Sequence, residues 1–156
     1  MADDDCSSER REAWRGNGGT SGQNRRGDLT LARRNITIGS DQRTFEATGC
    51  CQVTTTWPDK TGADRAAGTV VAEHLAACAQ VQGPLISTFS WKGSMERAEE
   101  WYCHFKTTMD RLPALQQRIL ELHPYDVPEI VALPILGGNP AYLEWIRNEV
   151  NAEPPG

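Results

Sequence analysis

Residues 80–108 limit most strongly what this chain can fold into, because they contain two long runs with the two-residue periodicity of β-strands. Every second residue from Leu85 to Trp91 falls on one strand face. In residues 95–108, Trp101, Cys103 and Phe105 alternate with mostly polar side chains, as expected for an antiparallel sheet that is covered on one side. A short turn at residues 92–94 separates the two runs. The pattern predicts a long antiparallel hairpin.

A strand and a helix are predicted before this hairpin. The β-branched run at residues 50–56 predicts a strand that stops at Trp57-Pro58-Asp59. The following residues predict an amphipathic helix, because apolar side chains recur at spacings of three and four. That stripe consists of Ala63, Ala66, Ala67, Val70, Val71, His74, Leu75 and Cys78.

The chain after the hairpin predicts a helix, a strand and a last helix. Asp110 is a candidate cap for the helix whose buried stripe is Leu112, Leu115, Ile119 and Leu122. Residues 130–135 are apolar enough for a central strand, with Pro134 at its end or on an edge. Asn139-Pro140 predicts the start of the C-terminal helix. The order of elements predicts an α+β fold, a ferredoxin-like split β-α-β sandwich with an added C-terminal helix.

Length and composition limit the class of protein. The 156 residues predict one domain at residues 48–151, preceded by a disordered tail at residues 1–47 that is poor in large apolar groups. A basic arm or a targeting segment is the alternative for that tail. The net charge of −5 argues against a nucleic-acid partner, and the lack of a long apolar run argues against a membrane span. Five cysteines without a CxxC pair favour a reducing, cytoplasmic location.

The heptapeptide His123-Pro124-Tyr125-Asp126-Val127-Pro128-Glu129 holds the densest polar chemistry in the second half of the chain. Its two prolines hold the backbone near extended values between a helix and an apolar strand. His123 could also be a helix-terminal imidazole that hydrogen-bonds locally, and Glu129 a surface carboxylate. The segment is therefore a candidate binding site with a structural alternative.

Several motifs, in order, resemble the CutA family of divalent-cation tolerance proteins over roughly residues 50–150. They are Thr56-Trp57-Pro58, Leu75-Ala76-Ala77-Cys78-Ala79, Trp91-Lys92-Gly93, Glu100, Lys106-Thr107, His123-Pro124-Tyr125, Pro128-Glu129, Leu133-Pro134-Ile135 and Tyr142-Leu143-x-Trp145-Ile146. The resemblance implies a compact homotrimer with sheets joined edge to edge. Such a ring would also cover the strand edges that a monomer leaves exposed.

The resemblance implies that His123 and Glu129 are metal ligands for a divalent cation such as copper or zinc. Thr55 stands where bacterial family members can carry a cysteine ligand. Without a thiolate the expected site is a weak, borderline one rather than a strong copper(I) site. The resemblance implies a small-ligand cleft between subunits, to which we assign Tyr125, Lys106, Trp91 and Glu100. The alternatives are a subunit wedge for Tyr125, an ion pair with Glu129 for Lys106 and a core position for Trp91.

The sequence therefore predicts a soluble trimeric divalent-cation-binding or tolerance protein of CutA type that is not an enzyme. One alternative is a small-molecule signalling or structural trimer without physiological metal binding. Another is a thiol hydrolase that uses Cys78 or Cys103 with His123. Nucleophilic catalysis would require an exposed thiol of lowered pKa beside an oriented base, and no nucleophile signature flanks either cysteine.

Overall fold

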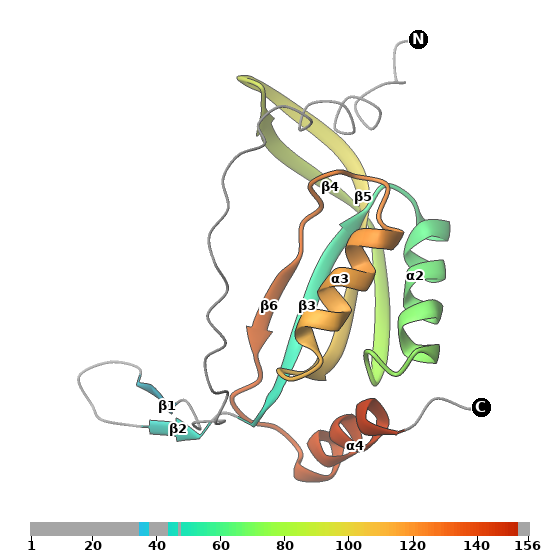
Figure 1. The fold of residues 1–156 in the computed structure, drawn as a ribbon. Helices are drawn as coiled ribbons and strands as arrows, with labels where there is room; N and C mark the ends of the chain where they lie inside the picture. Colours follow the sequence, from blue (N-terminus) through green and yellow to red (C-terminus); the bar gives the residue numbers. More distant parts are fainter. Residues whose placement is uncertain (1–34, 38–43, 47, 153–156) are drawn as a thin grey trace, which may run out of the picture.

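The computed structural model describes residues 35–37, 44–46 and 48–152. Its body is a four-stranded sheet of order β4-β5-β3-β6, in which every neighbouring pair is antiparallel (Figure 1). The elements are β3 (Cys50–Trp57), α2 (Lys60–Ala72), β4 (Cys78–Trp91), β5 (Ser94–Thr108), α3 (Leu112–Leu122), β6 (Val131–Pro134) and α4 (Pro140–Asn151). This order confirms the predicted ferredoxin-like fold with an added C-terminal helix.

The predicted N-terminal tail falls mostly outside the described residues. Within residues 1–47 the structure describes two short strands, β1 (Asn35–Thr37) and β2 (Thr44–Glu46), which pair antiparallel in a sheet of their own. The boundary that we predicted at residue 48 stays a prediction.

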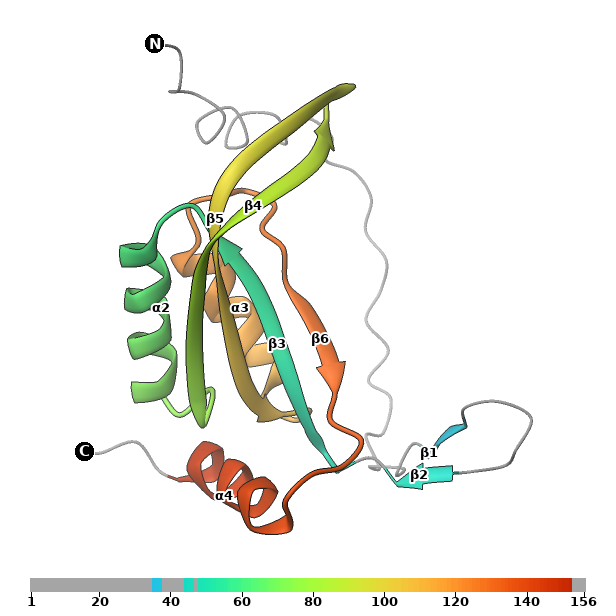
Figure 2. The same cartoon turned by 180° about the vertical axis from the view of Figure 1, so that it is seen from behind.

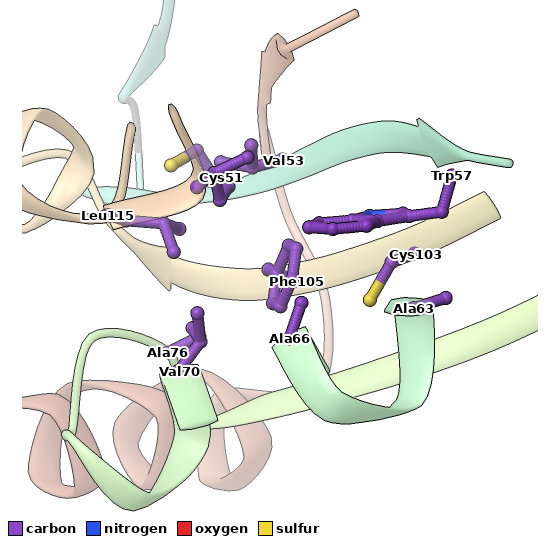
Figure 3. Close-up of a cluster of buried hydrophobic side chains, with 11 residues drawn as sticks. Cys51, Val53, Trp57, Ala63, Ala66, Val70, Ala76, Cys103, Phe105 and Leu115 are labelled. Carbon is purple, nitrogen blue, oxygen red and sulfur yellow. The ribbon is translucent and has the colours of Figure 1, made fainter. Parts of the chain in front are cut away.

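The main core lies between one face of the sheet and helices α2 and α3 (Figures 1 and 3). Val53 is opposite Phe105 and Trp57 is opposite Trp101 in the β3–β5 register, so alternate residues of both strands point to the helices. The predicted α3 stripe is confirmed, because Leu115 and Ile119 are fully buried and Leu112 and Leu122 pack beside them.

Helix α2 ends earlier than its apolar stripe predicted. The helix stops at Ala72, and His74 adopts a left-handed backbone with φ of 54°. The Nδ1 atom of His74 lies 2.8 Å from the carbonyl oxygen of Glu149, which ties this turn to α4. Leu75 follows the turn, and Cys78 is the first residue of β4. The prediction that Leu75 and Cys78 continue the helix is wrong, because the chain reverses at His74.

The β4–β5 hairpin extends beyond the rest of the sheet (Figures 1 and 2). Trp91 pairs with Ser94, and the two residues between them, Lys92 and Gly93, have φ of 47° and 84°. Two positive φ values at the centre of a two-residue loop are the geometry of a type I′ turn, which matches the twist of the strands. The predicted turn and the half-buried face that ends at Trp91 are confirmed.

The ends of α3 and α4 differ in how they are capped. The predicted cap at Asp110 is wrong, because the N-cap is Arg111 and no side chain accepts a hydrogen bond there. Pro113 lies in the first turn, where its missing N–H leaves one donor fewer to satisfy. The predicted start of α4 is confirmed, since Asn139 Oδ1 accepts from the Ala141 N–H at 3.1 Å.

Among the described strands, β6 lies at an edge of the sheet and pairs only with β3, so the prediction of a central strand is wrong for the described part of one chain. All four of its residues are exposed, including Val131 at 44% and Leu133 at 56%. Pro134 ends the strand, as predicted. The apolar side chains that suggested a central position are therefore exposed on this edge strand.

Helix α4 covers only one end of the second sheet face (Figure 2). Its side chains Leu143, Ile146 and Val150 pack with Cys50 and Ala77 in a smaller cluster. No helix covers the remainder of this face among the described elements. We call this uncovered part, which contains Gln52, Thr54, Gln80, Tyr102, His104, Lys106, Val131 and Leu133, the open face.

Candidate functional site

A polar and aromatic cluster lies where the end of β3, the middle of β5 and the end of α3 meet. The chain leaves α3 at His123 with φ of −79° and ψ of 136°, an extended conformation that Pro124 requires of the residue before it. This exit brings His123 and Tyr125 to the end of β3. Three predicted site residues, Glu100, His123 and Tyr125, are thereby brought together and buried, with exposed fractions of 3%, 8% and 5%.

His123 joins the loop after α3 to the end of β3. Its Nε2 atom lies 2.7 Å from the Thr56 carbonyl oxygen, and its Nδ1 atom lies 3.1 Å from the Tyr125 backbone nitrogen. The imidazole also contacts two aromatic rings, with ring centroids 4.2 Å from Trp57 and 5.0 Å from Tyr125. Of the two bonds, the one to Tyr125 is local, as in the structural alternative for His123, whereas the one to Thr56 joins distant parts of the chain.

Tyr125 reaches from the same loop to β5. Its hydroxyl donates to Glu100 Oε1 at 3.3 Å, so the phenol holds one end of a buried carboxylate. A buried carboxylate is costly unless polar groups compensate it, and Tyr125 supplies one of them. The hydrogen bond helps to position Oε1 of Glu100, next to the last β3–β5 pair, where the long hairpin leaves the body of the sheet.

Trp57 completes the cluster, and the sequence analysis did not predict it as a site residue. Its side chain is fully buried, and its Nε1 atom has no hydrogen-bond partner among the described residues. Buried indole N–H groups usually find an acceptor. Its position after the first strand was visible in the Thr56-Trp57-Pro58 motif, but its contact with His123 depends on the tertiary fold.

The other three predicted site residues lie elsewhere. Lys106 is on the open face, where its Nζ donates to Gln80 Oε1 at 2.6 Å rather than to Glu129. Trp91 is at the tip of the hairpin, with its Nε1 atom buried and unbonded among the described residues. Glu129 is exposed on the loop before β6. The structure does not gather these three with Glu100 and Tyr125 in one chain.

The donor atoms of the described residues do not form a complete metal site within one chain. In the part of the chain that the structure describes, no three His, Cys, Asp or Glu side chains are grouped as a metal ion requires. Both nitrogen atoms of His123 have hydrogen-bond partners. Coordination by His123 would therefore require one of these two bonds to break.

A cavity of about 430 Å³ lies on the open face at an irregularity in β4. The register shifts between Gln82 and Leu85, and Tyr102 and His104 of β5 line the opposite wall. Thr54 Oγ1 lies 3.0 Å from Nδ1 of His104, and burial together with the charge of Lys106 lowers the pKa of that imidazole. Sequence reasoning missed this cavity, although the Gly83-Pro84 pair inside a strand signals a bulge.

Three of the four described cysteines, Cys50, Cys51 and Cys103, are buried. Burial raises the pKa of Cys103 to about 12 and that of Cys51 to about 11, and burial also raises the pKa of Cys50. Cys78 is half-buried at the first position of β4, and its Sγ lies 3.4 Å from the hydroxyl of Tyr142, whereas His123 follows the last residue of α3. A thiol of raised pKa is a poor nucleophile, so Cys103 does not have the properties that a thiol hydrolase requires.

Fold and site together define the class of this protein: a small ferredoxin-like α+β protein with an aromatic and carboxylate cluster at the end of its sheet. A model of the family described as "CutA1 divalent ion tolerance protein" matches residues 51–149. The chain belongs to this family. None of its described helices is long and apolar enough to cross a membrane.

Individual relatives agree with this assignment. The chain is 41% identical over 93 residues to protein CutA 1, chloroplastic, of Oryza sativa, covering 60% of this chain and 52% of that protein. It is 44% identical over 92 residues to the divalent-cation tolerance protein CutA of Thermus thermophilus. That match covers 59% of this chain and 89% of the Thermus protein. The match thus spans about half of the rice relative.

A solved relative has the same fold. The crystal structure of CutA from Xylella fastidiosa is similar with a TM-score of 0.65 and 33% identity. The similarity covers 66% of this chain and 99% of that one. The family and the ferredoxin-like fold are therefore established for this chain.

Proposed function

We propose that this chain is a divalent-cation-binding protein of the CutA type that acts as a homotrimer and carries out no catalytic step itself. The observation that carries the proposal is the position of the Glu100–Tyr125–His123 cluster, whose loop leads directly into the exposed edge strand β6. A neighbouring copy that pairs with this edge would come close to the cluster. The relatives' names, which refer to divalent cations, supply the ligand class.

Assembly is supported by the surface of the sheet. Val131 and Leu133 place exposed apolar side chains on β6, whose second edge has no partner strand among the described residues, and such an edge is a template for pairing with another chain. No described helix covers the open face beside them (Figure 2). A closed three-fold ring would bury both features without leaving a further edge.

Subunit contact also bears on the number of metal ligands. One chain offers an exposed carboxylate at Glu129 and a buried one at Glu100, fewer donors than a divalent cation normally takes. We propose that a cleft between copies holds the cation, with Glu129 as one ligand and Tyr125, Glu100, Lys106 and Trp91 along the cleft. Oxygen donors would make this a generic, weak site rather than a copper(I) site.

Calorimetric titration of copper(II) and zinc(II) into the full chain tests the proposal. Glu129→Gln removes the charge of the proposed ligand, and Glu144→Gln, an exposed carboxylate on α4, is the matched control. We expect Glu129→Gln to weaken binding and Glu144→Gln to leave it unchanged. Other groups, such as Cys6, can add background binding, so the difference between isotherms is the readout. Identical isotherms for wild type and Glu129→Gln would overturn the assigned site and favour a trimer without physiological metal binding.

A further inference from the structure

The two hydrogen bonds of His123 determine which nitrogen atom of its ring carries the proton. A backbone N–H can only donate, so the contact at 3.1 Å from Tyr125 N makes Nδ1 an acceptor. A carbonyl oxygen can only accept, so the contact at 2.7 Å to Thr56 O requires the proton on Nε2. His123 is therefore the neutral Nε2–H tautomer, and each nitrogen atom has a fixed role.

The surroundings of the ring hold it in this orientation. The imidazole is 8% exposed and packs against Trp57 and Tyr125, with ring centroids at 4.2 Å and 5.0 Å. Coordination to Nδ1 would displace the Tyr125 N–H, and coordination to Nε2 would displace both the proton and the Thr56 carbonyl. Either change leaves a buried backbone group without its partner, which is costly.

We infer that His123 is a positioning residue that holds Tyr125 against Glu100, and is not itself a metal ligand. The chain of contacts runs from Thr56 through His123 to the Tyr125 backbone, and from the Tyr125 hydroxyl to Glu100 Oε1 at 3.3 Å. Through the backbone and the hydroxyl of Tyr125, His123 thereby helps to position Oε1 of Glu100. The expected effects on cation affinity rest on the proposed function. The assignment of the tautomer rests on the two hydrogen bonds of His123 and is independent of that function.

Nitrogen NMR of the three histidines in ¹⁵N-labelled full-length protein tests the inference directly. Without metal, we expect the His123 ring to show the neutral Nε2–H pattern, with a slowly exchanging Nε2 proton. At saturating zinc(II) we expect both His123 nitrogen signals to keep this pattern. An Nδ1–H tautomer, an imidazolium without metal at neutral pH, or a zinc-dependent change to a metal-bound nitrogen signal would overturn the inference. If calorimetry shows no zinc(II) binding at all, the proposed function fails, and the metal-free spectrum still decides the role of His123.

Variants separate positioning from ligation by a second readout. His123→Asn keeps an acceptor near the place of Nδ1 and can hold the Tyr125 N–H, whereas His123→Ala cannot. Loss of residues that orient metal ligands typically weakens binding by about 10–100-fold. We therefore expect His123→Ala to lose cation affinity in that range and His123→Asn to recover part of it. The double variant His123→Ala/Tyr125→Ala should bind the cation no more weakly than Tyr125→Ala alone. Additive losses in the double variant would overturn the inference, as would equal losses in the Ala and Asn variants.

Discussion

The hydroxyl of Tyr125 donates a hydrogen bond to Oε1 of Glu100 across 3.3 Å, and both side chains are at least nine-tenths buried. This bond links the loop after α3 to the strand β5 through a carboxylate that water barely reaches. Hydrogen bonds to charged groups contribute more to stability than neutral ones, and a buried acceptor that loses its donor is penalised. The bond is therefore both a structural link between the loop and β5 and one of the contacts that orient Glu100.

Tyr125→Phe removes this donor while keeping the ring. We expect the free energy of unfolding to fall by about 1–3 kcal/mol, measured by urea denaturation at a fixed protein concentration. Tyr142→Phe is the matched control, because Tyr142 is 42% exposed and its hydroxyl lies 3.4 Å from the thiol of Cys78 rather than beside a buried carboxylate. The control is expected to change stability by less than about 0.5 kcal/mol. Equal effects of the two substitutions would contradict the importance of the Glu100 contact.

The periodic parts of the fold were predictable from the sequence. The two-residue alternation through Val53 and Phe105 and the three- and four-residue spacing of Leu115 and Ile119 describe surfaces that the tertiary structure does bury. Asn139-Pro140 is similarly local, because the capping bond to Ala141 is made within one turn. Such features depend on neighbours along the chain, so the sequence alone indicates them.

The features that the sequence did not predict depend on contacts between distant segments. The end of α2 depends on the left-handed residue His74 and its contact with Glu149, far along the chain. The edge position of β6 cannot be deduced from its composition, because its apolar residues are typical of a central strand. In the candidate site, the heptapeptide was found, but the contact of His123 with Trp57 and Thr56 joins residues more than 60 positions apart.

Gly83 and Gly68 are expected to respond to alanine with opposite signs. A Cβ atom on Gly83 would lie 2.7 Å from Cε3 of Trp101, closer than real Cβ contacts, whereas a Cβ on Gly68 of α2 would meet nothing within 4 Å. Gly83→Ala should therefore lower the free energy of unfolding by about 1–3 kcal/mol through overpacking. Gly68→Ala should raise it by about 0.5–1 kcal/mol, because alanine favours the helix. Chemical denaturation measures both, and a stabilising Gly83→Ala would contradict the close packing of Trp101.

Thiol alkylation under native conditions should distinguish the described cysteines. We expect iodoacetamide to modify Cys78 first, because it is half-buried while Cys50, Cys51 and Cys103 are at most 1% exposed. The three buried thiols should react only when the protein unfolds. Peptide mass spectrometry of a Cys6→Ser variant over time follows each site separately. Rapid native labelling of Cys103 would contradict its burial and would restore the thiol hydrolase alternative.

Cys103 should make the protein lose stability in alkali. Burial raises the pKa of its thiol from the ordinary 9.0 to about 12, so the unfolded chain releases a proton that the folded protein retains. This contribution to stability is intact below about pH 9 and is lost as the pH rises toward 12. Within that window, one such group lowers the free energy of unfolding by about 1.4 kcal/mol per pH unit.

Cys103→Val removes this thiol. The free energy of unfolding of the variant should therefore fall less steeply than that of the wild type between pH 9 and 11. Urea denaturation at each pH measures the difference in the free energy of unfolding between the two proteins. The contributions of other titrating groups are common to both proteins and cancel in this difference. A separate comparison at pH 7 corrects for the change in packing. Parallel curves for the two proteins above pH 9 would contradict the raised pKa.

Leu133→Lys should disrupt the proposed homotrimer. Leu133 is 56% exposed on the edge strand β6, beside Gln52 of β3, and an edge lysine disfavours pairing with another strand. Leu120→Lys is the matched control, because Leu120 is 42% exposed on α3, on the side of the sheet away from the open face (Figure 1). Sedimentation equilibrium should give the mass of three chains for wild type and Leu120→Lys and a lower mass for Leu133→Lys. A monomeric wild type would refute the trimer, and a trimeric Leu133→Lys would show that β6 does not form the subunit contact.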